Sequence, residues 1–162
     1  MQTHSELVSV TPETWTYVGC RSGLEADEIA ASIEKAFSQL TEAIARGGVR
    51  TSGPPRAHYH YRDEKGLGFD LGFPIKSEDM NAAERAGLGV GRTLSGSALA
   101  LLHQGPYASL SEAYKKLEQD SKDKGFLGRG DTWEVYLNDP DNTPATKLKT
   151  QIYWPIAERS NS

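Results

Sequence analysis

Two short segments that read aromatic residue, proline, isoleucine lie half a chain apart and indicate an internal repeat. Phe73-Pro74-Ile75 and Trp154-Pro155-Ile156 are separated by 81 positions in a chain of 162 residues. Each segment ends a strand-like run, and each is preceded by a helical pattern and a further strand-like run. A duplication explains this order better than coincidence, and duplicated units usually pack about a pseudo-twofold axis. The sequence therefore predicts two copies of one strand-helix-strand-strand unit.

The first copy occupies about residues 6–76. Residues 6–21 alternate apolar and polar side chains around Pro12, which predicts one kinked or bulged strand. A capping-box spacing at Ser22 and Glu25 predicts the start of a long helix over about 25–46, which ends at two glycines. Its apolar stripe consists of Ile29, Ile33, Phe37, Leu40 and Ile44. We expect Phe37 to be buried against the sheet, and strands at 57–62 and 69–75 to complete the unit.

The second copy occupies about residues 92–157. A capping-box spacing at Ser109 and Glu112 begins a helix over about 109–124, on which Leu110, Tyr114 and Leu117 form an apolar face. We expect strands at 94–103, 132–137 and 147–156, and a surface connection at 77–91. The predicted fold is a single α+β domain over residues 1–162, with an antiparallel sheet built from both halves and two helices on one face.

Composition excludes several classes of protein. Lys and Arg number 18 against 22 Asp and Glu, for a net charge of −4, which argues against a nucleic-acid-binding surface and against direct DNA binding. No apolar run approaches the ~20 residues that a bilayer crossing needs, so no membrane association is expected. The polar N-terminal segment has no signal-peptide core, which favours the cytoplasm. The single cysteine, Cys20, excludes an internal disulfide and a cysteine-rich zinc site.

Glu134 stands in a β-branched and aromatic run, residues 132–137, although glutamate is depleted from strands. If that strand is half buried, the charge must be paired, neutralised or used. The neighbours Trp133 and Tyr136 favour a receptor for a flat cationic or hydrogen-bonding ligand. An exposed ion pair with a lysine is the alternative. Since Trp133, Val135 and Leu137 form an apolar face that we expect to meet the helices, Glu134 and Tyr136 should face a groove.

The strand at 57–62 carries the other candidate side chains. Alternation places Tyr59 and Tyr61 on one face and His58 and His60 on the other, and we expect Tyr59 in the groove. The two histidines point the same way, but zinc needs at least three protein ligands and no convincing third stands near them. No metal is therefore expected. His103, which ends a strand, is expected to make a structural hydrogen bond.

Five segments resemble, in order, the GyrI-like small-molecule-binding domain, which is also the effector-binding half of AraC-type and MerR-type multidrug regulators. They are residues 53–60, 71–75, 103–110, 133–140 and 151–156. The resemblance implies a pseudo-symmetric sheet with two helices, no cofactor, and a cleft for flat, often cationic compounds. Its carboxylate matches Glu134. The aromatic residues that we expect to line the cleft are Tyr59, Phe73, Tyr107, Trp133, Tyr136, Tyr153 and Trp154, of which one of the last two faces away.

The regulators carry a helix-turn-helix domain ahead of this module, whereas only a few residues precede the first predicted strand here. The chain therefore resembles the stand-alone form, whose known functions include toxin sequestration, inhibition of a DNA topoisomerase and hydrolysis of cyclopropane-bearing genotoxins. Two functional classes stay open. One is a module for drug resistance or sensing that binds a planar aromatic or cationic compound, with a protein partner or homodimer left open. The other is a hydrolase, with Glu134 as general base or acid and Tyr136 assisting.

Overall fold

The computed structural model describes residues 4–157, so the first three residues of the polar N-terminal segment lie outside the described part. The chain divides into two compact units. The first unit comprises residues 12–93, and the second unit comprises residues 4–11 together with 94–157. No helix in the described part is long and apolar enough to span a membrane.

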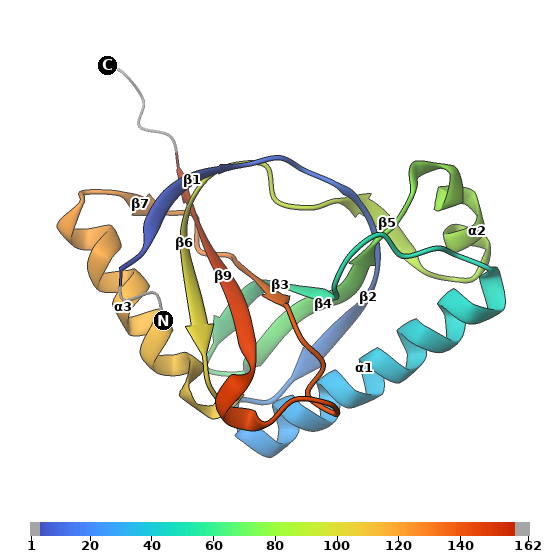
Figure 1. Ribbon diagram of the computed structural model, residues 1–162, viewed down its shortest axis with the longest axis horizontal. Coiled ribbons are helices and arrows are strands. Elements are labelled where there is room, and N and C mark those ends of the chain that lie inside the picture. Colours follow the sequence, from blue (N-terminus) through green and yellow to red (C-terminus); the bar gives the residue numbers. More distant parts are fainter. Residues whose placement is uncertain (1–3, 158–162) are drawn as a thin grey trace. The chain divides into compact units, whose positions relative to one another are not determined.

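The first unit is an antiparallel sheet with strand order β3-β4-β2-β5, along which α1 lies (Figure 1). Within it β4 pairs with both β2 and β3, and β5 pairs with β2. Its elements are β2 (Thr14–Ser22), α1 (Ala26–Gly47), β3 (Arg56–Asp63), β4 (Gly66–Pro74), α2 (Met80–Arg85) and β5 (Gly89–Arg92).

Helix α1 covers one face of this sheet. It ends where predicted, because Gly48 takes the left-handed conformation with φ of 66° and donates its N–H to the last turn. The side chains it buries are Ala36, Leu40 and Ala43. Phe37 is 39% exposed, so the prediction that it is buried is wrong. Small alanines, which the apolar stripe did not include, bring this helix close to the sheet.

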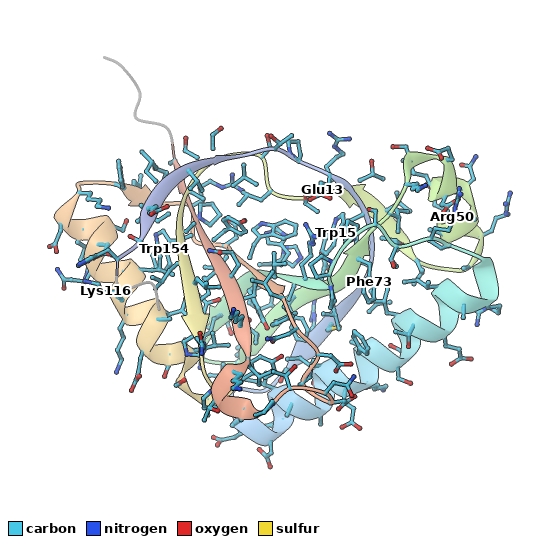
Figure 2. All side chains as sticks on the ribbon, viewed as in Figure 1. Glu13, Trp15, Arg50, Phe73, Lys116 and Trp154 are labelled. Carbon is cyan, nitrogen blue, oxygen red and sulfur yellow. The ribbon has the colours of Figure 1, made fainter. Side chains whose placement is uncertain are left out.

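The two faces of the first sheet differ in what they carry. Phe73 faces α1, where its ring centroid lies 5.9 Å from that of Phe37 (Figure 2). Since side chains alternate along a strand, Leu71 and Phe69 of β4 share that face, and both are almost fully buried. Asp70, between them, points to the opposite face.

The second unit is an antiparallel sheet in the order β1-β6-β9-β8, with β7 also paired to β9. Its elements are β1 (Glu6–Val10), β6 (Gly96–Gln104), α3 (Leu110–Asp123), β7 (Leu127–Gly128), β8 (Thr132–Tyr136) and β9 (Lys149–Ala157). Helix α3 packs on one face through a cluster of buried apolar residues. These are Leu99, Leu101, Ala113, Leu117, Ile152 and Ile156.

The two units share one topology, which confirms the duplicated α+β plan. In the first unit the strands of the repeat are β2, β3 and β4, and the last of them pairs with both others. In the second unit they are β6, β8 and β9, and β9 again pairs with both others. Each first strand then receives one extra antiparallel neighbour, β5 on β2 and β1 on β6.

Four local predictions are wrong in whole or in part. Residues 6–21 form two strands rather than one kinked strand, and the break falls around Pro12. The segment 77–91 contains α2 and most of β5, so it is more than a surface connection. Glu25 rather than Ser22 is the N-cap of α1, and no side chain caps it. Ser109 does precede α3, but its hydroxyl bonds to Pro106 rather than to the helix.

Candidate functional site

Glu134 lies on the α3-covered face of the second sheet. It is directly across from Ile152 on β9, which in turn is across from Leu101 on β6. Cross-strand partners share a face, and Ile152 and Leu101 belong to the core cluster under α3. The expectation that the opposite face of β8 meets the helix is therefore wrong. The glutamate is only 5% exposed.

Two tyrosine hydroxyls hold the Glu134 carboxylate. Tyr114 on α3 donates to Oε2, and Tyr136, two residues along the same strand, donates to Oε1 at 2.9 Å. Each carboxylate oxygen thus accepts one phenolic hydrogen. Burial raises the pKa of Glu134 above its usual value, and the two hydrogen bonds oppose that shift. The carboxyl is consequently poised to hold either a proton or a positively charged group.

Tyr107 extends this cluster toward the surface. Its ring centroid lies 5.9 Å from that of Tyr136, with the ring planes at 68°, which is an edge-to-face arrangement. Tyr107 is 38% exposed, so it forms the outer edge of the site. Burial, followed by the charges of Glu134 and Asp139, raises the pKa of its phenol, and the group stays a neutral donor.

A polar layer adjoins Tyr136 on the same face. Tyr136 is directly across from Thr150, which is directly across from His103. His103 makes the structural hydrogen bond predicted for it, with Nε2 2.9 Å from the Ser109 hydroxyl. That hydroxyl donates to the Pro106 carbonyl, so we infer that Nε2–H of His103 is the donor between them.

Two buried polar atoms of this layer have no hydrogen-bond partner within the described residues. Burial lowers the pKa of His103, so the ring is neutral and Nδ1 carries a lone pair. Within the described residues, neither His103 Nδ1 nor the hydroxyl of the fully buried Thr150 has a hydrogen-bond partner. Buried polar atoms are normally paired, and orphaned ones mark places where a ligand or ordered water belongs. Thr150 is directly across from Tyr136, which contacts Glu134, and His103 lies one strand further along the same row.

The remaining sequence-predicted residues of the second unit separate onto two faces. Trp133 and Tyr153 are cross-strand partners on the face opposite Glu134. Trp154 lies on the Glu134 face, where it packs against the core cluster under α3. Trp154 is thus the member of the Tyr153–Trp154 pair on the side of the carboxylate.

The two predicted residues of the first unit lie on the α1 side of their sheet. Tyr59 packs on Phe69 with ring centroids 5.4 Å apart, and Phe73 contacts α1 as described. Tyr61 does not share their face. A β-bulge between Tyr59 and Tyr61 shifts the register, so that Tyr61 pairs with Gly68. The alternation predicted for this strand is therefore wrong beyond His60.

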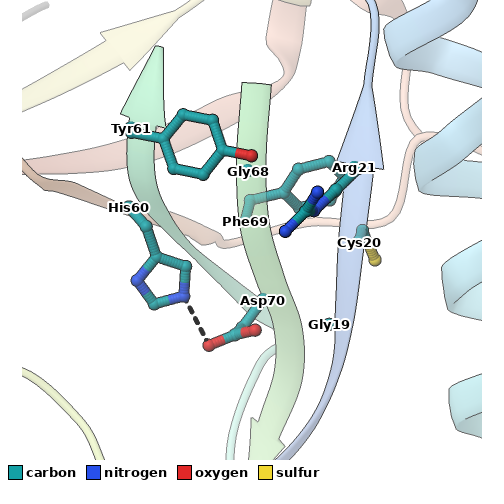
Figure 3. Close-up of a pocket in the computed structure, with 8 residues that line it drawn as sticks. All are labelled: Gly19, Cys20, Arg21, His60, Tyr61, Gly68, Phe69 and Asp70. Atoms are coloured by element: carbon teal, nitrogen blue, oxygen red, sulfur yellow. Dashed lines mark hydrogen bonds and ion pairs between the residues drawn. The ribbon is translucent and has the colours of Figure 1, made fainter. Parts of the chain in front are cut away.

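A hollow of about 470 Å³ lies on that other face of the first sheet, between β2, β3 and β4 (Figure 3). The Tyr61 ring lies across Gly68, where a Cβ would come within 2.2 Å of it. His60 Nε2 and Asp70 Oδ2 are 2.7 Å apart at the rim. With His58, these two residues form a cluster whose candidate ligand atoms all lie within 4.8 Å of one another.

The sequence analysis did not predict the contacts of two residues, Tyr114 and Asp70. Tyr114 was read as a core residue because it falls on the apolar stripe of its helix, and nothing in the stripe distinguishes a packed tyrosine from one that donates to a carboxylate. Asp70 was missed as a neighbour of His58 because the contact depends on strand pairing. A polar residue inside the apolar run at 66–74 was the available signal.

Comparison with known proteins identifies the family. The model of the GyrI-like small molecule binding domain matches residues 12–157. The chain belongs to this family. No curated protein sequence matches it significantly.

Solved structures share the fold at low sequence identity. The C-terminal domain of EcmrR has a TM-score of 0.75 at 17% identity, over 96% of this chain and 98% of that one. A hydrolase from Listeria innocua has a TM-score of 0.67 at 14% identity, over 96% and 93% of the two chains. SAV2435 bound to tetraphenylphosphonium has a TM-score of 0.67 at 8% identity, over 96% and 94%. These identities establish a common fold and nothing finer.

Proposed function

We propose that this protein binds a planar aromatic or cationic compound at Glu134 and thereby sequesters or senses it in drug or toxin resistance. The observation that carries the proposal is a nearly buried carboxylate held by the hydroxyls of Tyr114 and Tyr136. The family is one of small-molecule binding domains, and one structure of the same fold holds the lipophilic cation tetraphenylphosphonium.

Charge and desolvation explain why a cation suits this site. Within residues 4–157, the partners of the Glu134 carboxylate are two tyrosine hydroxyls and no cationic side chain. An organic cation would supply the counter-charge, and burial of its apolar surface would favour binding. The rings of Tyr107 and Tyr136 offer negative faces to the same cation, which attract it further. The lone pair on His103 Nδ1 gives a ligand N–H or O–H a place to donate.

Binding of tetraphenylphosphonium and of a planar cationic dye, measured by calorimetry, tests this proposal. Glu134→Gln keeps the shape and one acceptor oxygen but removes the charge. We expect it to weaken cation binding by about 1.5–3 kcal/mol, roughly ten- to hundredfold in Kd. A neutral planar compound should lose much less. Glu84→Gln, which removes an exposed glutamate of α2, should bind as the wild type does. Equal cation affinity in wild type and Glu134→Gln would refute the proposed role of the carboxylate.

A catalytic alternative for the same site, implied by the resemblance to stand-alone GyrI-like proteins, is hydrolysis of a strained cyclopropane. A raised pKa makes the Glu134 carboxylate a stronger base than an exposed glutamate, and a tyrosine hydroxyl lies against it. Glu134 would take a proton from water while the water oxygen bonds to a ring carbon and the ring C–C bond breaks. The released electron pair goes to the group conjugated with the ring, which Tyr136 protonates, and Glu134 returns the proton to Tyr136. A neighbour of this fold is a hydrolase from Listeria innocua.

Turnover separates the two functions. Purified protein is mixed with a tenfold excess of a cyclopropane-containing alkylator, and the products are followed by mass spectrometry. An enzyme converts the whole excess to the water adduct, and Glu134→Gln abolishes the conversion. A binding protein protects at most one equivalent and forms no adduct.

A further inference from the structure

We propose that the first unit carries a binding site for a divalent transition-metal ion of the zinc class, formed by His58, His60 and Asp70. The candidate ligand atoms of the three side chains lie within 4.8 Å of one another. Two imidazoles and one carboxylate form a donor set that zinc uses with water in its remaining position. All three residues belong to the first unit, whereas Glu134 belongs to the second unit.

Strand pairing assembles this cluster. His58 on β3 is directly across from Asp70 on β4, so the two side chains share a face. The register shifts between Tyr59 and Tyr61, which makes His60 the extra residue of a β-bulge. Bulges re-aim side chains, often beside functional sites. Here the bulged His60 reaches Asp70, with Nε2 2.7 Å from Oδ2 (Figure 3).

The distances fit a metal ion after a small movement. Two ligands at zinc bond lengths of about 2.1 Å stand about 3.4 Å apart on a tetrahedron. The His60–Asp70 separation of 2.7 Å is shorter than this value, and the 4.8 Å limit of the cluster is longer. Small rotations about the side-chain bonds of these residues would bring both separations to the tetrahedral spacing. The ion would replace the hydrogen bond between His60 and Asp70 with two coordinate bonds.

The surroundings leave room for an ion and its remaining ligands. His60 and Asp70 line the hollow of about 470 Å³ described above, together with Gly19 and Arg21. Gly19 is directly across from Asp70 on β2, and its missing side chain keeps that flank of the carboxylate open. Water or a small anion could complete the coordination from the hollow, where the Arg21 guanidinium would favour an anion.

Titration with Zn²⁺ and Co²⁺ tests the site. Zn²⁺ affinity is measured by competition with a chromophoric indicator in chelator-treated buffer, and Co²⁺ is followed by its visible absorption. We expect one saturable Zn²⁺ per chain and an intense Co²⁺ band of low coordination number. Asp70→Asn and His60→Ala should each weaken Zn²⁺ binding at least about tenfold. The His60 side chain is 43% exposed, so its removal should leave the fold intact, as circular dichroism will verify.

Two variants serve as matched controls. His4→Ala removes an exposed histidine outside the cluster and should bind Zn²⁺ as the wild type does. Glu134→Gln should also keep full Zn²⁺ affinity, so failure of the organic-ligand proposal and failure of this one give different results. Absence of saturable binding in the wild type overturns the proposal. Unchanged affinity in both Asp70→Asn and His60→Ala overturns it equally.

Discussion

Glu134 on β8 lies directly across from Ile152 on β9, so a carboxylate and a fully buried aliphatic side chain occupy neighbouring positions on one face of the second sheet. A charge in that position costs free energy unless it is paired or hydrogen-bonded. Tyr114 and Tyr136 supply hydrogen bonds but no positive charge. Burial therefore disfavours the ionised form of this carboxyl, and this makes the stability of the fold sensitive to pH.

The stability of the protein should depend on pH through Glu134. Burial raises its pKa, so the folded chain binds this proton more tightly than the unfolded chain does. The group's contribution to the free energy of unfolding is complete below its usual value of 4.5 and is lost as pH rises through the raised value. Urea unfolding at several pH values should show this loss in the wild type, and Glu134→Gln should lack it. Parallel pH profiles for the two proteins would contradict the prediction.

Tyr114→Phe should destabilise the protein at neutral pH. The substitution keeps the ring but takes one of two donors from a buried carboxyl, and leaving a buried acceptor unsatisfied costs about 1–3 kcal/mol. The loss should shrink in acid, where Glu134 is protonated. Chemical unfolding at both pH values measures it. Tyr153→Phe, on the opposite face of the sheet, is the control and should change little at either pH.

Leu40 and Phe37 should differ sharply in what they contribute to stability. Leu40 is fully buried under α1, and Leu40→Ala should cost about 2–5 kcal/mol. Phe37 retains mainly its ring contact with Phe73, so Phe37→Ala should cost only about 1 kcal/mol. Equilibrium unfolding of the two variants decides the order. A greater loss of stability in Phe37→Ala than in Leu40→Ala would contradict the prediction.

The thiol of Cys20 should react slowly with alkylating reagents. Burial, followed by the charge of Asp70, raises its pKa to about 11, so only about one thiol in a thousand is ionised at pH 8. The unfolded chain in urea should react at least ten times faster. Asp70→Asn removes the charge that contributes to the raised pKa of Cys20. Alkylation of the folded protein should therefore become faster, but not as fast as that of the unfolded chain. Because this is the only cysteine, total adduct by mass spectrometry reads the site directly.

The sequence was a good guide to topology because its signals are local and repeated. The Pro74 and Pro155 segments mark equivalent strands, and these strands are the central ones of the two repeat sheets. Helix α1 ends at Gly48 because a left-handed residue there needs no side chain. The strand β5 was missed because its residues, Gly89–Arg92, have little intrinsic strand preference and depend on pairing with β2.

The candidate site was predicted less completely. The sheet face that a side chain occupies and the pairing of strands both depend on residues far apart in the sequence. Glu134 was singled out correctly as unusual, but its apolar neighbours on β8 suggested the wrong face for the helix. The bulge at His60 reversed the alternation on β3 beyond that residue, so Tyr61 does not share the face of Tyr59. A single residue inserted into a strand moves every later side chain to the other face. No propensity of the individual residues reveals such an insertion.

The strand β1 pairs with β6 although residues 12–93 lie between them, and Glu6 faces Ala100 across that pair. A ribosome that makes about 5–20 residues per second therefore completes β1 roughly 5–20 seconds before its partner exists. During that interval the whole of the first unit is synthesised, while β1 has no edge of its own unit on which to dock. The first strand to be synthesised therefore stays unpaired until β6 is made, and of the α-helices and strands in the described residues only α3, β7, β8 and β9 follow its partner along the chain.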